Sequence, residues 1–550
     1  MTNAQIAEQF SLLSKLMELH GENSFRTKNY STAAFNIDKL PVQFTDLEPE
    51  KIFSIKGIGE STGKKILEII KTGRIKALED LALKTPPGVL EMLSIKGIGP
   101  KKIATIWKKM EIESPGELLY ACNENRLARY SGFGQKSQET IQNAVAFYLQ
   151  HQGSHLFAQI EEYALQLDKI LKKAFPGEKF EATGQVRMHS LIIEKLQWVT
   201  TVPTKKLRDF FRKHKFTEEE ILTGSSFFRT PENVLLEFYP RTGDLFYPTL
   251  FETSASEQFL EEWNKEKNSR STFKSEEDIF KSRGLHVIPP FLREKASVIA
   301  RAKKDSFSNL IQPSDIRAII HCHSDWSDGS NTIEQLAKAC IKKGYEYMVI
   351  SDHSKSAGYA NGLSEERLKH QHLYVDELND KLAPFRIFKG IESDILGDGS
   401  LDYSDRILST FDVVIASVHS NVKMQEEKAT ARLLKAIQNP YTTILGHMTA
   451  RLLLSRPGFP VDFKKIIAAC AENNVVIEIN ANPRRLDMDW YWVDYALDKG
   501  VMVSINPDAH DIDEFDHCRY GVLAAQKGGV KKENNLSSFS LKQFEKFLLH

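Results

Sequence analysis

Six histidines in the C-terminal half of the chain follow short apolar runs, in the company of aspartate and glutamate. Imidazole and carboxylate groups suit zinc, manganese or iron, and such sites need no cysteine. The candidate ligands are His321, His323, Asp328, His353, Glu392, His419, His447, Asp508 and His510. Nine ligands are too many for one ion, so the set indicates two or three ions. Such clusters hydrolyse phosphate esters, because they lower the pKa of a bound water and stabilise the leaving oxygen.

The elements that must position these side chains are predicted by the apolar runs themselves. Runs at 318–320, 347–350, 413–416, 443–445, 475–479 and 501–505 alternate with amphipathic helical stretches, and Gly390-Ile391 precedes Glu392. Repeated strand–helix units indicate a parallel sheet closed into a barrel, whose strand ends meet on one face. A single histidine at a strand end is more often a hydrogen-bonded structural residue. Six independent structural histidines would not all follow strand ends, so the group favours metal binding.

The N-terminal part contains a repeated segment with regularly spaced glycines. Residues 53–59 (FSIKGIG) recur at 93–99 (LSIKGIG), and a looser copy, YSGFGQK, spans 130–136. Each copy predicts a helix, a Gly-x-Gly turn and a second helix whose first N–H groups can face a phosphate. The pattern resembles the helix-hairpin-helix, which holds the DNA backbone without reading sequence. The candidate phosphate-binding residues are Gly57, Gly59, Lys64, Lys65, Gly97, Gly99, Lys101, Lys102, Gly132 and Gly134.

Charge supports this interpretation over three ordinary turns in a helical region. The 550-residue chain has zero net charge, yet residues 51–109 hold 13 Lys and Arg against five Asp and Glu. A local excess of this kind predicts salt-dependent affinity for DNA that is indifferent to sequence.

Composition bounds the class of protein. Hydrophobic residues make up 41% and charged residues 27%, and the length predicts roughly three to five units of about 100–200 residues each. Five scattered cysteines argue against a disulfide framework and for a reducing compartment. The sequence shows neither an apolar run of the ~18–20 residues that a membrane span needs nor a signal pattern. We expect a cytoplasmic monomer with no membrane partner.

Residues 317–550 resemble the PHP (polymerase and histidinol phosphatase) family, with all nine motif positions filled. The resemblance implies a distorted (β/α)7 barrel with two or three divalent ions, zinc or manganese, with iron as a further option. One ion would take His321, His323, Glu392 and Asp508. A second would share Glu392 and take His419 and His447, and a third would take Asp328, His353 and His510. The expected catalytic residues are His321, His323, Asp328, Glu392, Asp508 and His510.

Four arginines stand near the later strand ends of this region: Arg451, Arg456, Arg484 and Arg485. A guanidinium fork can hold a phosphate, and it can equally form a surface ion pair. Both roles stay open for each of the four.

The whole chain resembles the bacterial family X DNA polymerases, in which a polymerase-beta-like core precedes a PHP domain. The resemblance rests on the paired hairpins and on LMELHGEN at 16–23, the stretch 277–290, and EINANPRR at 478–485. It implies a multidomain chain: a lyase-like helical domain (1–80), a fingers-like helix-hairpin-helix domain (81–150), an α+β palm (151–240), a thumb-like domain with linker (241–312) and the PHP domain (313–550). It also implies gapped or primer-ended DNA as the partner, and allows a monovalent cation at the hairpins.

The palm departs from the family pattern. Nucleotidyl transfer there needs three carboxylates for two magnesium ions, after a Gly-Ser turn. Here the turn is Gly184-Gln185, residues 194–197 read EKLQ, and the third position is Leu235. A slipped alignment would place Glu194 or Glu237 in the site, which leaves at most two carboxylates. We expect a palm that folds and holds DNA but does not polymerise.

These patterns predict a metal-dependent DNA phosphodiesterase in repair, a 3′–5′ exonuclease that could also nick at abasic sites. Three alternatives stay open: a small-molecule phosphatase of the histidinol-phosphate type, a DNA-binding scaffold with a structural metal cluster, and a polymerase that uses other carboxylates. Lys65 matches the lysine with which related proteins form a Schiff base at abasic sites. Phosphate binding is its favoured role, because a nucleophilic amine needs a lowered pKa.

Overall fold

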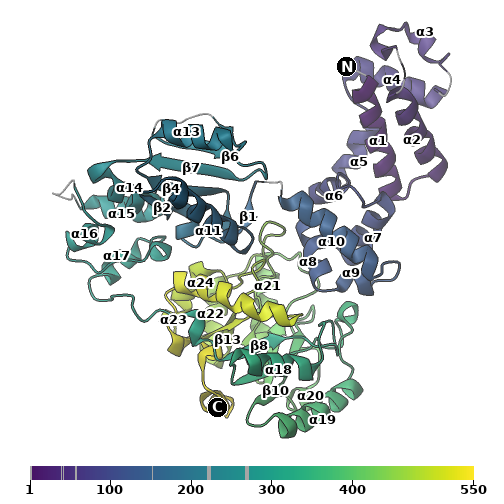
Figure 1. Cartoon of the computed structure of the whole chain (residues 1–550). Coiled ribbons are helices and arrows are strands. Elements are labelled where there is room, and N and C mark those ends of the chain that lie inside the picture. Colours follow the sequence, from purple (N-terminus) through teal and green to yellow (C-terminus); the bar gives the residue numbers. More distant parts are fainter. Residues whose placement is uncertain are drawn as a thin grey trace. The chain divides into compact units, whose positions relative to one another are not determined.

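A computed structural model describes residues 3–38, 40, 42–55, 58–150, 153–219, 224–266 and 272–549. The chain forms two compact units. One comprises residues 1–123 and 132–149, and the other comprises residues 124–131 and 150–550. Figure 1 shows the helical character of the first unit and the sheets of the second. Among the described residues, no helix has both the length and the apolar character to cross a bilayer.

The described part of the first unit is built from helices. They are α1 (Asn3–His20), α2 (Ser24–Asp38), α3 (Pro49–Ile52), α4 (Glu60–Thr72), α5 (Lys76–Leu83), α6 (Pro87–Met92), α7 (Pro100–Met110), α8 (Pro115–Asn123) and α10 (Gln135–Gln150). Helices α4 and α7 begin directly after Gly59 and Gly99. Gly97 and Gly132 have φ angles of +97° and +92°, a backbone conformation that favours glycine. The second and third copies therefore fold as helix, turn and helix, as predicted. In the first copy, residues 56 and 57 lie outside the described residues, and α4 follows Gly59.

The second unit contains a five-stranded mixed sheet in the region predicted as the palm. Its strand order is β2 (Phe180–Thr183), β4 (Lys195–Thr200), β7 (Leu235–Pro240), β6 (Ser226–Arg229) and β5 (Thr217–Glu218). Strands β4 and β7 run parallel, and the other neighbours run antiparallel. Helices α11 (Phe157–Ala174) and α13 (Thr204–Lys213) contribute to its core, in which Trp198, Phe211 and Phe238 are fully buried. This confirms the α+β architecture.

A small helical region follows the mixed sheet and has an aromatic core of its own. Its helices are α14 (Phe246–Thr253), α15 (Glu257–Lys265), α16 (Glu276–Lys281) and α17 (Ser297–Arg301). Phe251, Phe259, Trp263 and Phe280 pack together in this core.

The C-terminal region forms a parallel seven-stranded sheet whose strands follow one another in space as in the sequence. They are β8 (Ala318–Cys322), β9 (Tyr347–Ile350), β10 (Arg386–Asp394), β11 (Val413–Ser417), β12 (Ile444–Leu445), β13 (Val476–Asn480) and β14 (Val503–Asn506). A parallel bridge between Cys322 and Ala509 joins the two edges, so the barrel is almost closed. All six predicted apolar runs overlap these strands, although the runs at 443–445, 475–479 and 501–505 begin one or two residues before the strand does. Strand β10 is the one that ends near Glu392.

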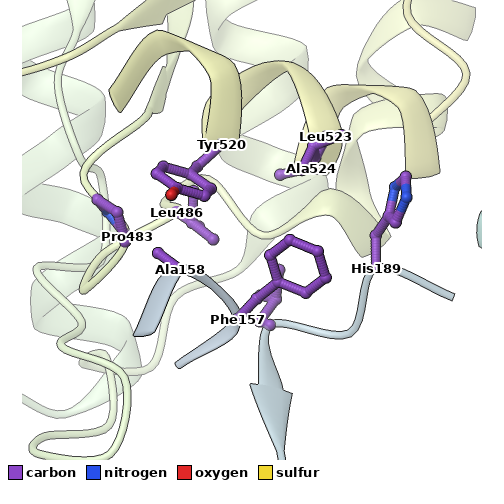
Figure 2. Close-up of a pocket in the computed structure, with 9 residues that line it drawn as sticks. Phe157, Ala158, His189, Pro483, Leu486, Tyr520, Leu523 and Ala524 are labelled. Atoms are coloured by element: carbon purple, nitrogen blue, oxygen red, sulfur yellow. The ribbon is translucent and has the colours of Figure 1, made fainter. Parts of the chain in front are cut away.

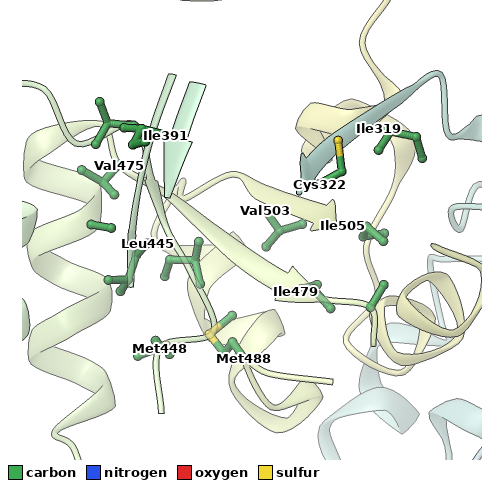
Figure 3. Close-up of a cluster of buried hydrophobic side chains, with 14 of the residues drawn as sticks. Ile319, Cys322, Ile391, Leu445, Met448, Val475, Ile479, Met488, Val503 and Ile505 are labelled. Carbon is green, nitrogen blue, oxygen red and sulfur yellow. The ribbon is translucent and has the colours of Figure 1, made fainter. Parts of the chain in front are cut away.

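The barrel buries apolar side chains on both faces of its strands. Alternate residues belong to two clusters: Ile319, Met348 and Val414 lie in one, and Ile320, Val349 and Ile415 in the other. Figure 3 shows part of the larger cluster, including Leu445, Ile479 and Val503. The surrounding helices are α18 (Ile333–Lys343), α19 (Glu365–Leu382), α20 (Asp405–Leu408), α21 (Glu426–Ile437), α22 (Phe463–Asn473), α23 (Trp490–Asp498), α24 (Cys518–Lys527) and α25 (Leu541–Leu548). Burial on both faces explains the continuous apolar runs of the sequence.

Helix α24 joins the barrel to the two regions that precede it. Figure 2 shows Tyr520, Leu523 and Ala524 of α24 facing Phe157 and His189, around a void of only about 10 Å³. The Lys527 side chain is 1% exposed, and its Nζ lies 2.7 Å from Glu294 Oε1. The same ammonium donates to the carbonyl oxygen of Met188 at 2.7 Å. One buried lysine thus connects the palm, the helical region and the barrel.

Candidate metal centre

All nine predicted ligands lie together at the carboxyl ends of the barrel strands. His321 is in β8 and Glu392 in β10, and the other seven lie in the loops that follow strands. Eight of the nine are buried and His419 is nearly so. Strand ends converge on one face of a βα barrel, and this convergence brings residues from 321 to 510 into contact.

Glu392 lies close to five of the six histidines of the cluster. Its Oε1 lies 3.2 Å from His321 Nε2, 3.2 Å from His419 Nε2 and 2.9 Å from His447 Nε2. Its Oε2 lies 3.0 Å from His353 Nδ1 and 3.6 Å from His323 Nε2. Because each oxygen faces a different set of imidazoles, this carboxylate has the geometry to bridge two ions.

Three groups of potential ligands have donor atoms within 4.8 Å of one another: His321, His323, Glu392 and Asp508; His323, Asp328, His353 and His510; and His353, Glu392 and His419. The first group is the ligand set predicted for the first ion. The second group contains the set predicted for the third ion, Asp328, His353 and His510, together with His323. In the third, His353 stands where His447 was expected. The Nε2 of His447 lies 2.9 Å from Oε1 of the shared Glu392, although His447 belongs to none of the three groups.

Polar atoms without hydrogen-bond partners show that the cluster suits metal ions. Seven such buried atoms are His321 Nε2, His323 Nδ1, His353 Nδ1, His447 Nδ1, His510 Nε2, Asp328 Oδ2 and Glu392 Oε2. Buried polar atoms almost always have a partner, and nitrogen and oxygen donors of this kind are ligands for zinc, manganese or iron. The residues present therefore fit a multi-ion site.

Electrostatic coupling is strong inside the cluster. Burial disfavours ionised Glu392, but positive His419, His321 and His353 outweigh it and hold the pKa of that carboxyl well below its usual range. Burial, helped by the charges of His510 and His353, lowers the pKa of His323 to about 3. Burial opposes the protonation of His510, yet Asp328 raises the pKa of that imidazole to about 10. Ions that bind here must displace protons from such imidazoles.

Two supporting carboxylates were not predicted. Glu478 Oε2 lies 2.7 Å from His321 Nδ1, and its Oε1 accepts a hydrogen bond of 3.0 Å from the backbone N–H of His447. Asp394 makes a short hydrogen bond with His419 Nδ1. Carboxylates in this position fix the orientation of a ligating imidazole. The available signals were a glutamate inside an apolar run, and an aspartate two residues after a candidate ligand.

We expect Glu478→Gln to lower metal affinity and hydrolytic rate by about 10–100-fold, because an amide orients His321 less firmly than a carboxylate does. Equilibrium dialysis with Mn²⁺ and initial rates measure the two effects. Glu472→Gln, on the exposed side of α22, is the matched control. Unchanged affinity and rate in Glu478→Gln would contradict this supporting role.

The four arginines occupy different environments. Arg485 is 5% exposed, and its Nε lies 3.5 Å from Asp508 Oδ2, which places it beside the cluster. Arg451 is ion-paired with Asp489 and donates to the carbonyl oxygen of Arg485 at 2.9 Å. Arg456 donates to the carbonyl oxygen of Ala450 at 2.8 Å. Residues 451–458 line a cavity of about 440 Å³, and Arg484 follows Pro483 in the half-buried part of a neighbouring loop.

The predicted phosphate-binding residues of the hairpins lie in the first unit, apart from Gly57, which lies outside the described residues. Lys64 pairs with Glu60 at 2.6 Å, and Lys65 Nζ lies 5.9 Å from the centre of the Tyr30 ring. Lys101 Nζ is 3.9 Å from Glu18, and Lys102 Nζ donates to Ser137 at 2.9 Å. Gly134 precedes α10 as Gly59 and Gly99 precede their helices. The four lysines are exposed or half-buried.

In the palm, side chains on the strands where the family pattern places its carboxylates contact one another. Lys195 Nζ lies 2.8 Å from Glu237 Oε2, and Gln197 Nε2 donates to the same oxygen at 2.9 Å. The Gln197 side chain also approaches the turn, because a Cβ on Gly184 would meet its Oε1 at 1.9 Å. In the described part of the chain, all groups of three or more potential metal ligands lie in the barrel.

Comparison with known proteins gives matches to three family models. A PHP domain matches residues 320–482, a helix-hairpin-helix domain matches residues 1–75, and a SAM-like helix-hairpin-helix tandem matches residues 89–145. The "DNA polymerase/3′-5′ exonuclease PolX" of Bacillus subtilis (strain 168) is 33% identical over 582 aligned positions, covering 100% of this chain and 99% of that protein.

Shorter relatives are also similar to part of the chain. A "Probable phosphatase" of Caldanaerobacter subterraneus subsp. tengcongensis is 30% identical, covering 34% of this chain and 74% of that protein. Another, from Vibrio parahaemolyticus, is 27% identical, covering 43% of this chain and 94% of that protein.

Proposed function

Because the chain belongs to the PolX proteins, the bacterial family X DNA polymerases with a PHP domain, we propose that it is a metal-dependent 3′–5′ exonuclease in DNA repair. The observation that carries this proposal is the buried nine-residue cluster around Glu392. Helix-hairpin-helix segments in the same chain favour gapped or primer-ended DNA as the substrate. Nicking at abasic sites by the same centre belongs to this proposal.

The residues of the centre have different roles in phosphodiester hydrolysis. Divalent ions at such a site activate a water molecule and stabilise the leaving oxygen. Glu392 places two groups of ligands around one carboxylate, and Glu478 and Asp394 fix the ring orientations of His321 and His419. Arg485 stands beside Asp508, where a guanidinium can orient a phosphate of the strand.

For the palm, we propose a DNA-holding role without nucleotidyl transfer. Lys195 puts a positive charge 2.8 Å from Glu237, one of the two carboxylates that a slipped alignment would place in the expected magnesium site. Leu235, which pairs with Lys195 across the parallel strands, offers no ligand. An ammonium in that position repels a dication.

Separate apolar cores support four of the five domains in the proposed division. One core lies within residues 6–75, another within 157–238, a third within 251–310, and the barrel holds its own. Lys65 is half-buried, and its Nζ lies 5.9 Å from the centre of the Tyr30 ring. For this residue we favour phosphate binding over Schiff-base chemistry, because a nucleophilic amine needs a lowered pKa.

The test is a nuclease assay on a gapped duplex whose upstream strand carries a 5′ label. With Mn²⁺, we expect a ladder of products that shorten from the 3′ end, with release of mononucleotides and loss of activity on chelation. Zn²⁺ in place of Mn²⁺ addresses the identity of the metal. If the strand stays intact with both ions, the proposal fails.

A small-molecule phosphatase is the second candidate, since shorter relatives carry the name "Probable phosphatase". Turnover of histidinol phosphate that exceeds the turnover of DNA would reverse the ranking. The N-terminal 310 residues favour DNA, because a small ester needs no helix-hairpin-helix domains.

A further inference from the structure

A short segment from between the second and third hairpins lies against the metal centre. Helix α9 (Arg126–Arg129) and its flanks, residues 124–131, belong to the compact unit that contains the barrel. Asn125 Nδ2 donates to Ser330 Oγ at 3.2 Å, and Arg129 donates to the carbonyl oxygen of Ser327. Both serines lie in the loop that carries Asp328, so the segment holds a loop of the centre directly.

Arg126 of α9 reaches a second loop of the centre. Its guanidinium carbon lies 4.3 Å from the centre of the Tyr359 ring, in η5 (Gly358–Ala360). The Tyr359 and His353 rings are 6.1 Å apart, so the guanidinium stands one aromatic ring away from a candidate ligand. Stacking on an aromatic face holds the plane of an arginine in a fixed orientation.

The two arginines of the segment make different contacts. Arg129 bonds a backbone carbonyl and serves to anchor the helix. The Arg126 side chain is 24% exposed, and the carboxylate of Glu124, its neighbour across the helix end, is at 3.9 Å. A planar guanidinium held at the edge of a metal site is suited to bidentate contact with a phosphate.

We propose that Arg126 binds a phosphate of the DNA strand next to the one that is cleaved. This inference rests on the proposed exonuclease function and names the residue that makes the centre selective for a polynucleotide. A strand presents neighbouring phosphates to α9, whereas a small phosphate ester presents none. Arg126 is therefore a positioning residue, and the chemistry stays with the cluster around Glu392.

The experiment compares the full-length protein with Arg126→Ala and Arg126→Lys, using Mn²⁺ and two substrates. One substrate is a single-stranded oligonucleotide, and the other is bis(p-nitrophenyl) phosphate, which has no neighbouring phosphate. We expect Arg126→Ala to raise KM for the oligonucleotide on the order of tenfold, with kcat nearly unchanged. The KM of Arg126→Lys should fall between those of the wild type and Arg126→Ala. Lysine keeps the positive charge but loses the planar guanidinium that can make two parallel hydrogen bonds.

Salt dependence gives a readout that a purely structural role would not change. The slope of log(kcat/KM) against log[salt] should become shallower by about 0.7 in Arg126→Ala, the value for one lost phosphate contact on a single strand. Turnover of bis(p-nitrophenyl) phosphate should stay as in the wild type. Arg406→Ala, which removes an arginine that is 77% exposed on α20, is the matched control. It should change neither the salt slope nor the turnover of bis(p-nitrophenyl) phosphate.

The outcomes separate the two hypotheses. A wild-type protein that leaves DNA intact overturns the exonuclease function itself. If the wild type cleaves DNA and Arg126→Ala keeps the same KM and salt slope, the function stands and the role of Arg126 is wrong. Equal loss of activity on both substrates would show that Arg126 only supports the fold, and this too overturns the proposal.

Discussion

Replacing Glu392 by glutamine should reduce release of nucleotides from a 3′ end by about 10³-fold or more. Both of its oxygens face imidazoles, at distances from 2.9 to 3.6 Å, and all three ligand groups meet at or beside this carboxylate. Glutamine keeps the shape of the side chain but removes the negative charge and one of the acceptor oxygens. Three residues belong to two of the ligand groups: His323, His353 and Glu392. Glu392 is the only carboxylate among these three.

Three measurements test this expectation. Initial rates on the 5′-labelled gapped duplex give the loss of activity, and elemental analysis should show fewer bound ions per chain than in the wild type. Thermal unfolding followed by circular dichroism establishes that the variant folds. Glu472→Gln removes the same charge from the exposed side of α22 and should keep wild-type rate and metal content. A Glu392→Gln protein that retains both its ions and its rate would contradict the assignment of Glu392 as the shared ligand.

The second large effect is the absence of primer extension. In the Glu392→Gln background, shortening of the primer can no longer conceal synthesis, so this variant is the right protein for the assay. With a gapped duplex, all four nucleotides and Mg²⁺ or Mn²⁺, we expect no product longer than the primer. The reason is the network in which Lys195 and Gln197 both contact Glu237. In the described part of the palm, no three potential metal ligands lie together.

An electrophoretic mobility shift on the same duplex provides the control, because it shows whether DNA is bound when extension is absent. Extension by even one nucleotide would show that the palm acquires its ions by another route. In that event the palm is a second active centre and not only a support for DNA.

The sequence was sufficient to predict the barrel and to predict that the nine candidate ligands lie together at one end of it. Strands buried on both faces appear as uninterrupted apolar runs, and most of the ligands lie within a few residues of the end of such a run. Strand β10 was harder, because Arg386 and Lys389 interrupt its apolar pattern and only its end near Glu392 was visible. Parallel topology then forces the strand ends onto one face, so the proximity of residues far apart in the chain follows from the fold.

Partners across long sequence distances could not be predicted. Glu478 contacts His321 over 157 residues of chain, and a lone glutamate in an apolar run does not indicate its partner. The contacts in the palm could not be predicted for the same reason. Lys195, Gln197 and Glu237 are each visible in the sequence, but the contacts among them depend on the register of β4 and β7. Contacts of α9 with the loop of Asp328 depend on tertiary packing alone and have no sequence signal.

The buried ammonium at the end of α24 has a consequence for how this protein can change over time. Lys527 holds the carbonyl of Met188 and the carboxylate of Glu294, so a gene fragment that encodes only the barrel would leave a charge without partners on an uncovered face. On the proposal that the palm performs no synthesis, it still serves the hydrolytic domain by covering this face. We expect substitutions inside the palm to be tolerated better than substitutions on the surface that meets α24.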